Sequence, residues 1–352
     1  MKSPTWKNKL NGSRYLVTGN SAFFFGATRS VADEIGDMFN FNWASYLGLR
    51  ELWWQVRAYK EAFPSLGMID VEKRFLSGMK LPGGLDLKKT ILNRSWDSHE
   101  REFAKAILFE ACTIYECWLE EVCAIAFSRK AADTAAMQLQ FPVGSVDRNG
   151  SPNDYTRAIA KANNAANLSP LMKSEFLPTL KANGLNCYGH LNTYLMVYRF
   201  FKECRNSYIH SSGLASKKLV GIYQNLVSAY GTPSAIPSWP ELPFNHQFQF
   251  PEPAEGQKII LLLEDCKLFA TLVHRMIVTL DAALCVTKQS QMWLKRSLGE
   301  YISTQKKNKW KTLSPNLTKR QAAVRGLLKS TKMPKPLNIA PIEVWLSAEG
   351  VI

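Results

Sequence analysis

The stretch YLMVYRFFKECRNSYIHSSG, residues 194–213, decides how this sequence is interpreted. It starts as an apolar and aromatic run and ends in a compact polar cluster of Arg205, Asn206, Ser207 and His210. Charged and titratable side chains are unusual at the end of a buried segment. The three residues after the cluster are Ser-Ser-Gly, which favour the end of a helix. We therefore expect a long helix over 188–204 that ends at this cluster.

The cluster has the order Arg–Asn, three residues and then His, with Ile209 before the histidine and Gly213 soon after it. This order resembles the R-N-x-x-x-H signature of the HEPN superfamily, which consists of all-helical domains, many of them metal-independent ribonucleases. The resemblance covers roughly residues 97–287. It implies that the catalytic residues are Arg205, Asn206 and His210, with no cofactor and no metal.

These residue types fit RNA cleavage because RNA carries its own nucleophile. A base that removes the proton of the ribose 2′-OH lets that oxygen attack the adjacent phosphorus, which leaves a 2′,3′-cyclic phosphate and a 5′-hydroxyl. Histidine exchanges a proton near neutral pH, and the planar guanidinium of arginine matches two phosphate oxygens. We therefore expect His210 as the base and Arg205 as the phosphate clamp. The resemblance assigns to Asn206 the orientation of the histidine or of a phosphate oxygen.

The spacing of the motif limits what one helix can do. Five residues along an ideal helix turn by about 500°, so Arg205 and His210 point about 140° apart, whereas Asn206 and His210 share a face. Three arrangements are open: the helix breaks near Arg205, the long arginine side chain reaches round, or two protomers each contribute a group. The HEPN resemblance implies the last, a homodimer in which two motifs meet across a two-fold axis and form a composite active site.

Residues 97–130 give the clearest helical pattern outside the motif. Apolar residues recur there every three or four positions and form one stripe, which is typical of a helix buried on one side. Asp97 or Ser98 is expected to cap the first turn. Glu116 lies opposite the stripe, so we expect its carboxylate to face water.

Weaker helical signals fill most of the remaining chain. Helices are expected over 43–63, from 216, over 257–286 and from about 314. His274 lies in the middle of one of them, and we interpret it as a structural residue rather than a catalyst. Residues 21–30, SAFFFGATRS, are consistent with a short strand or a buried turn.

Together these signals predict an all-α fold, and the resemblance implies a helical bundle of HEPN type. Residues 1–96 are expected to form a mostly helical N-terminal extension. Residues 97–287 are expected to form the HEPN-like core, with an insertion near 131–187. Residues 288–352 are expected to form a basic C-terminal region, an arm that follows the core.

Most of the net charge of +15 lies in one C-terminal segment. Between residues 288 and 335, thirteen lysines and arginines stand against one acid, Glu300. A concentrated cationic segment attracts a polyanion through counterion release, without reading its sequence. We therefore expect RNA to be bound by Lys306, Lys307, Lys309, Lys311, Lys319 and Arg320. A solvated basic tail or a membrane-surface patch has a similar composition.

Several other classes of protein are disfavoured by the sequence. It has no phosphate-binding loop and no H-E-x-x-H, and its five histidines lack the spacing of metal ligands. The seven cysteines include no C-x-x-C pair, which indicates reduced thiols rather than disulfides or a zinc site. No apolar run is long enough to span a bilayer and no signal peptide is recognised, so we expect a cytoplasmic protein without a membrane partner. A Cys–His hydrolase stays open because Cys204 lies near His210.

The resemblance therefore implies an endoribonuclease that acts on tRNA, mRNA or rRNA. Members of that family often act as toxins or anti-phage effectors, which implies an antitoxin or a regulatory protein as a further partner. The alternative is a non-enzyme. It would be a catalytically inactive helical protein that binds RNA or DNA, or a scaffold subunit of a defence or toxin–antitoxin complex.

Overall fold

A computed structural model describes residues 23–76, 84–237, 247–304 and 314–352. Every regular element in these ranges is helical, so the predicted all-α class is confirmed; three isolated β-bridges also occur there. No helix in these ranges is both long enough and apolar enough to cross a bilayer. The helices are α1 (Gly26–Ala62), α2 (Met68–Leu76), η3 (Lys88–Leu92), α3 (Trp96–Ala126), α4 (Arg129–Gln138), α5 (Tyr155–Asn163), α6 (Pro170–Glu175), α7 (Leu177–Lys181), η4 (Tyr188–His190), α8 (Leu191–His210), α9 (Lys217–Tyr230), η5 (Pro233–Ala235), α10 (Leu263–Leu284), α11 (Lys288–Thr304), α12 (Leu317–Ser330) and α13 (Ile339–Ala348).

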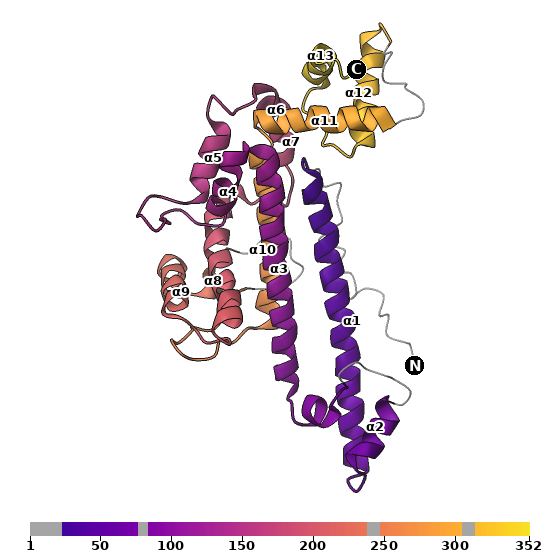
Figure 1. Cartoon of the computed structure of the whole chain (residues 1–352), viewed down its shortest axis with the longest axis vertical. Coiled ribbons are helices and arrows are strands. Elements are labelled where there is room, and N and C mark those ends of the chain that lie inside the picture. Colours follow the sequence, from indigo (N-terminus) through magenta and orange to yellow (C-terminus); the bar gives the residue numbers. More distant parts are fainter. Residues whose placement is uncertain (1–22, 77–83, 238–246, 305–313) are drawn as a thin grey trace.

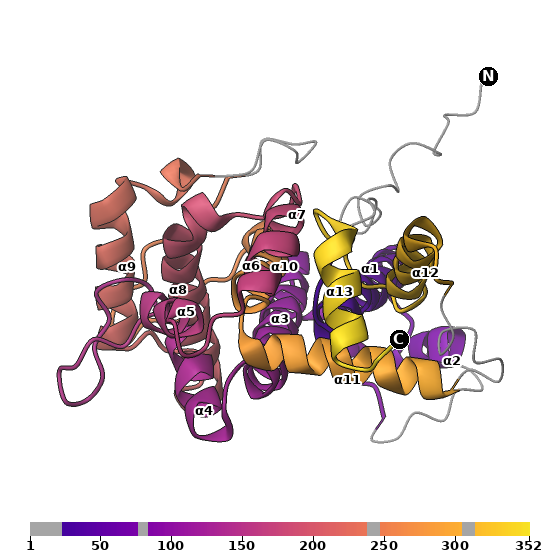
Figure 2. The ribbon, with the colours of Figure 1, turned by 90° about the horizontal axis from the view of Figure 1, so that it is seen from above.

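The centre of the fold is α10, which packs against α1, α3 and α8 (Figure 1). Seen from above, α9, α8, the α3–α10 pair and α1 lie in a row, and α11 to α13 gather at one end of it (Figure 2). Almost every residue of α10 is buried, whereas α3 buries one stripe, as its pattern predicts. Ile107, Ala111, Ile114, Trp118 and Val122 of that stripe are all buried. This arrangement covers α8 on both sides and leaves its last two residues, Ile209 and His210, exposed.

The N-terminal helix α1 begins much earlier than the predicted 43–63, because a distant carboxylate caps its first turn. Oδ2 of Asp281 accepts a hydrogen bond from the backbone N–H of Phe24 at 2.8 Å, and Oδ1 accepts from that of Phe25 at 3.0 Å. The hydroxyl of Thr28 donates to the same carboxylate at 2.6 Å. Phe24 and Phe25 are fully buried in a bend, so the interpretation of 21–30 as a strand is wrong and a buried turn is nearer the structure. An anion at a helix N-terminus satisfies donors that the helix itself leaves free.

The start of α3 and the end of α8 also differ from the prediction. The N-cap of α3 is Ser95, whose side chain accepts from the backbone of Ser98, so the predicted caps Asp97 and Ser98 are wrong by a few residues. Helix α8 runs through the motif and ends at His210, with Ser211 as its C-cap. Gly213 follows with a φ of 79°, and a Cβ there would lie 2.8 Å from the Tyr208 ring, so only glycine fits this reversal.

The expected insertion at 131–187 and the expected C-terminal region both pack into the same hydrophobic cluster as α3 and α10. In the 131–187 segment, Pro170 and Pro178 each stand in the first turn of a short helix, where proline is tolerated. In the C-terminal region, α11 buries Leu294, Leu298 and Ile302 in that cluster. The predicted helix near 314 is α12, which Asn316 caps. Removal of α11 would therefore expose part of the core.

Candidate functional site

His210 is the last residue of α8, and its side chain is exposed. Asn206 lies one turn earlier and is half-buried. Because the helix is continuous over both residues, they share a face, as the spacing predicts. The alternative in which the helix breaks near Arg205 is wrong, since α8 passes through that position without interruption.

Arg205 does not reach round to His210 but turns to the neighbouring helix α3. Its Nη2 lies 2.5 Å from Oε1 of Glu116, and the Arg205 side chain is only 18% exposed. Nζ of Lys202 lies 2.8 Å from the same carboxylate oxygen. The prediction that Glu116 faces water is therefore wrong, because α8 packs against the polar side of α3, opposite the apolar stripe.

Two cations hold Glu116 in its charged form. Burial alone would raise the pKa of this carboxyl, but the Lys202 ammonium and the Arg205 guanidinium outweigh burial and lower it from its usual range. The Lys202 ammonium also donates to the side chain of Gln140. One carboxylate of α3 thus holds two basic side chains of α8 on the side of α8 that faces α3.

A third cation, Arg199, lies farther back on α8. Its guanidinium carbon is 4.3 Å from the centroid of the Phe141 ring, a stacked cation–π contact. Burial lowers its pKa. Arg199, Lys202 and Arg205 follow each other every three residues, and among these three Glu116 pairs only with the last two. This part of α8 therefore carries an excess of positive charge.

Asn206 belongs to a second polar network. Its Nδ2 donates a long hydrogen bond of 3.5 Å to Oε2 of Glu203, and Nζ of Lys218 lies 2.7 Å from the same oxygen. Glu203 is buried while Lys218 is exposed, so this pair links α8 to the first turn of α9. The contact directs the amide nitrogen of Asn206 toward Glu203, in the turn that precedes it.

Exposed apolar side chains lie on the segments next to the end of α8. Ile209, Leu214 and Ile260 are each at least two-fifths exposed. The segments that carry them are held together, since the Tyr208 hydroxyl donates to the carbonyl of Ile259 at 2.9 Å and the N–H of Ile259 donates to the carbonyl of Gly213 at 2.9 Å. The end of α8 therefore combines an exposed imidazole with exposed aliphatic surface.

Cys204 is not available as a nucleophile. Its side chain is fully buried, and burial raises the pKa of the thiol well above its ordinary value. A thiol must be accessible and deprotonated to attack a substrate. The Cys–His hydrolase that the sequence leaves open is therefore disfavoured by the structure. All seven cysteines are free thiols, and six of them are buried.

His274, in the middle of α10, lies in the core. Its side chain is 1% exposed, and burial lowers its pKa to about 4. Neither ring nitrogen has a hydrogen-bond partner within the described residues. The ring packs beside Phe23, with the two centroids 6.4 Å apart. Its position agrees with the structural interpretation.

The six basic residues expected to bind RNA fall into three groups. Lys306, Lys307, Lys309 and Lys311 lie outside the described residues. Lys319 is exposed near the start of α12. Arg320 is paired instead: its Nε lies 2.8 Å from Oε1 of the buried Glu343, in an ion pair that is not aligned as a hydrogen bond. The structure thus separates a free cation from one that neutralises a buried acid, which the sequence did not predict.

No group of three or more histidine, cysteine, aspartate or glutamate side chains within the described ranges is arranged to hold a metal ion. Comparison of the chain with protein-family models, with curated proteins and with solved structures finds no match.

Proposed function

We propose that this protein is a metal-independent endoribonuclease in which His210 acts as a general base or acid. The observation that supports this most is the exposed imidazole of His210 at the end of α8, with Asn206 on the same face and an excess of positive charge behind it. A nucleophile supplied by the ribose needs only a proton acceptor, a cation for the charge that develops on phosphorus and a proton donor. His210, Arg205 and Lys202 have this chemistry.

The proposed active site is composite, formed by two copies of the chain. In one copy, Arg205 is bound to Glu116 of α3, and His210 is the one imidazole that the motif supplies. A second copy related by a two-fold axis would supply the second imidazole, so that one acts as base and the other as acid. Ile209, Leu214 and Ile260 are exposed beside His210, and their burial between copies would favour this pairing.

The proposed substrate is RNA, in the class of tRNA, mRNA or rRNA, and the proposed role is that of a toxin or anti-phage effector. The basic C-terminal region supports a polyanionic substrate, since Lys319, Arg325 and Lys329 are exposed on α12. An effector of this kind needs a restraint, so an antitoxin or regulatory protein is the partner we propose beside RNA.

The proposal is tested by incubating the protein with total RNA in excess chelator and identifying the ends of the products. We expect cleavage to persist and to leave cyclic phosphate and 5′-hydroxyl ends. His210→Ala removes this cleavage, whereas His190→Ala, which changes an exposed histidine at the other end of the same helix, leaves it intact. Products with 5′-phosphate ends would show that water, not the ribose, is the nucleophile.

A second candidate function is a catalytically inactive helical protein that binds RNA or DNA or serves as a scaffold subunit. The ion pair between Arg205 and Glu116 favours it, because Arg205 then has a structural role that needs no substrate. In this case His210→Ala leaves function intact, while substitution of the exposed lysines removes it. Deletion of 288–335 is unsuitable for this comparison, because it also removes Leu294, Leu298 and Ile302 from the core.

A further inference from the structure

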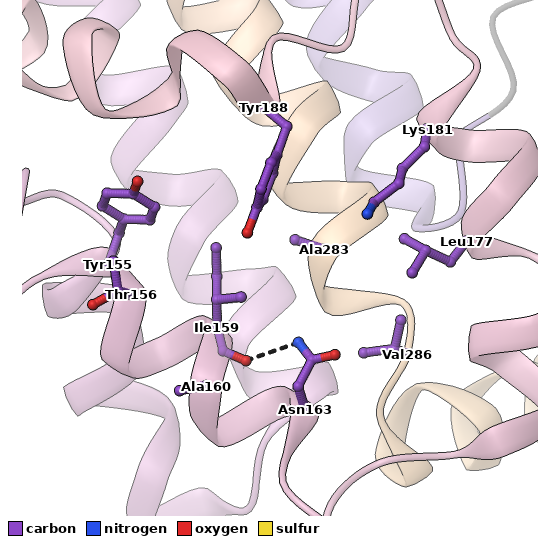
Figure 3. Close-up of a pocket in the computed structure, with 10 residues that line it drawn as sticks. All are labelled: Tyr155, Thr156, Ile159, Ala160, Asn163, Leu177, Lys181, Tyr188, Ala283 and Val286. Carbon is purple, nitrogen blue, oxygen red and sulfur yellow. Dashed lines mark hydrogen bonds between the residues drawn. The ribbon is translucent and has the colours of Figure 1, made fainter.

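A cavity separate from the motif opens where α5, α7, η4 and the end of α10 meet (Figure 3). Its volume is about 380 Å³, which is within the range of small-molecule sites. Tyr188 lines it just before the first residue of α8, whereas His210 is the last residue of that helix. A helix of this length spans about 30 Å, so the cavity and the motif lie at opposite ends of α8.

The polar groups of the cavity converge on one space. Figure 3 shows the ammonium of Lys181 and the hydroxyl of Tyr188 pointing into it, with the amide of Asn163 on the opposite side. Nζ of Lys181 is 5.4 Å from the centroid of the Tyr188 ring. Nδ2 of Asn163 donates to the carbonyl of Ile159 at 2.9 Å, which leaves the amide oxygen of Asn163 as an acceptor.

The charge of the cavity is positive. No carboxylate is among the side chains that line it, and within the described residues Lys181 has no salt bridge to an acid. A second ammonium stands close to the chain segment that follows α5, since Nζ of Lys288 donates to the carbonyl of Ala166 at 2.9 Å. An unpaired ammonium at the mouth of a concave site favours an anion.

The remaining wall is apolar. Ile159, Leu177, Ala283 and Val286 line the cavity beside the convergent polar groups. Tyr155 lies at the edge of the cavity. Burial and, to a smaller extent, the nearby Tyr188 hydroxyl raise the pKa of the Tyr155 phenol, so the phenol remains a neutral donor. Apolar walls with a few directed polar groups are the usual composition of a site for a small organic molecule.

We propose that this cavity binds a small organic anion with a flat apolar body. The anionic group, a carboxylate or a phosphate monoester, pairs with the ammonium of Lys181. The Tyr188 hydroxyl donates to the same group, and the apolar body lies against Ile159, Leu177 and Val286. The Asn163 amide oxygen accepts from a donor at the far edge of the ligand. The proposed site does not depend on the proposed ribonuclease activity, and it is tested separately.

The test is isothermal titration calorimetry of the full chain with two probes, adenosine 5′-monophosphate and 2-naphthoate, which separate a phosphate from a carboxylate ligand. We expect saturable binding of at least one probe in the micromolar to millimolar range. Lys181→Met weakens it by about tenfold, the size of one charge-assisted hydrogen bond. Ala160→Phe abolishes it, because Ala160 is an exposed residue of the cavity wall and a larger side chain there fills the space.

The matched control is Lys173→Met, which removes an exposed lysine of α6 outside the cavity and leaves the affinity unchanged. Circular dichroism and thermal unfolding establish that each variant is folded. Binding of either probe with these variant effects supports the site and identifies its anionic group. Failure of both probes to saturate at millimolar concentration, or an affinity that Lys181→Met and Ala160→Phe leave unchanged, would overturn the proposal.

Discussion

The guanidinium of Arg205 lies 2.5 Å from the carboxylate of Glu116, so the arginine of the motif is bound to the neighbouring helix and not to the histidine of its own helix. The pair joins α8 to α3, and both side chains are mostly shielded from water, with 18% and 26% exposure. Arg205 thus has a structural role in the single chain, whether or not it also contacts RNA.

Substitution of Glu116 by glutamine separates these two roles. Glu116→Gln removes the charge that holds Arg205 and Lys202, and we expect a loss of about 1–3 kcal/mol in the free energy of unfolding. Because the variant frees the guanidinium without removing it, RNA cleavage should persist. Urea unfolding and cleavage are measured on the same preparation. Cleavage that disappears while the protein stays folded would mean that Glu116 itself is needed at the site.

His274 makes the protein sensitive to acid. Its pKa falls from an ordinary value near 6.5 to about 4 because the ring is buried. A histidine with a lowered pKa keeps the folded state stable above its ordinary pKa and costs stability as pH falls from there toward the lowered value. The stability of His274→Leu relative to wild type is therefore expected to be about 2 kcal/mol greater at pH 5 than at pH 8. Urea unfolding at the two pH values measures the difference, and an equal effect at both would contradict a buried neutral ring.

Asp281 has the opposite dependence on pH. Burial raises its pKa to about 6, although Thr28 and the backbone of Phe24 and Phe25 stabilise the charged form. A carboxyl whose pKa is raised in the folded state favours folding when protonated, so its contribution falls as pH rises from about 4 to about 6. This trend offsets that of His274 in the wild-type protein, so only single variants reveal either one.

Asp281→Asn is expected to destabilise the protein at neutral pH by about 1–3 kcal/mol. The NH₂ group of asparagine replaces one carboxylate oxygen, so one of the two backbone N–H groups loses its hydrogen-bond acceptor. The loss should be larger at pH 4 than at pH 7, because the contribution of Asp281 to folding falls as pH rises through its raised pKa. Hydrogen exchange of the first turn of α1 should also accelerate, since that turn loses its cap. Unchanged exchange there would mean that this carboxylate does not hold the start of the helix.

The basic region provides a prediction about the salt dependence of RNA binding. Replacement of Lys306, Lys307, Lys309, Lys311 and Lys319 by glutamine should weaken binding and reduce the slope of log K against log salt by up to about 0.7 for each lysine that contacts a single strand. Arg320→Gln is the contrasting variant. We expect it to destabilise the protein, because Glu343 is left buried without its partner, and to leave the slope unchanged. An unchanged slope in the five-lysine variant would show that this region does not contact RNA.

Some helices are predicted well from the sequence, because the spacing of their apolar residues or a local capping residue is enough to define them. The stripe of α3 and the capped start of α12 follow from the residues within each helix. The start of α1 does not, because it depends on Asp281, which lies 257 positions after Phe24 in the sequence. A carboxylate that far along the chain gives no local signal.

The candidate site was predictable only in part, and for a similar reason. His210 and Asn206 share a face because they are one helical turn apart, and this spacing can be read from the sequence. The partner of Arg205 is 89 positions away on another helix, so its pairing with Glu116 required the packing of α8 on α3. Arg320 was grouped with the free lysines by charge, although it neutralises Glu343. Charge in a sequence shows how many cations exist, whereas tertiary contacts decide which remain free.

The role of His210 is tested most directly by single-turnover cleavage of RNA by the wild type and by His210→Ala, in excess chelator, with identification of both the new 3′ ends and the new 5′ ends. We expect cyclic phosphate products from the wild type and a loss of at least about a hundredfold in rate for His210→Ala, the usual contribution of a positioned general acid or base. His190→Ala should cleave at the wild-type rate. Equal cleavage by His210→Ala and the wild type would contradict the claim that this imidazole carries the reaction.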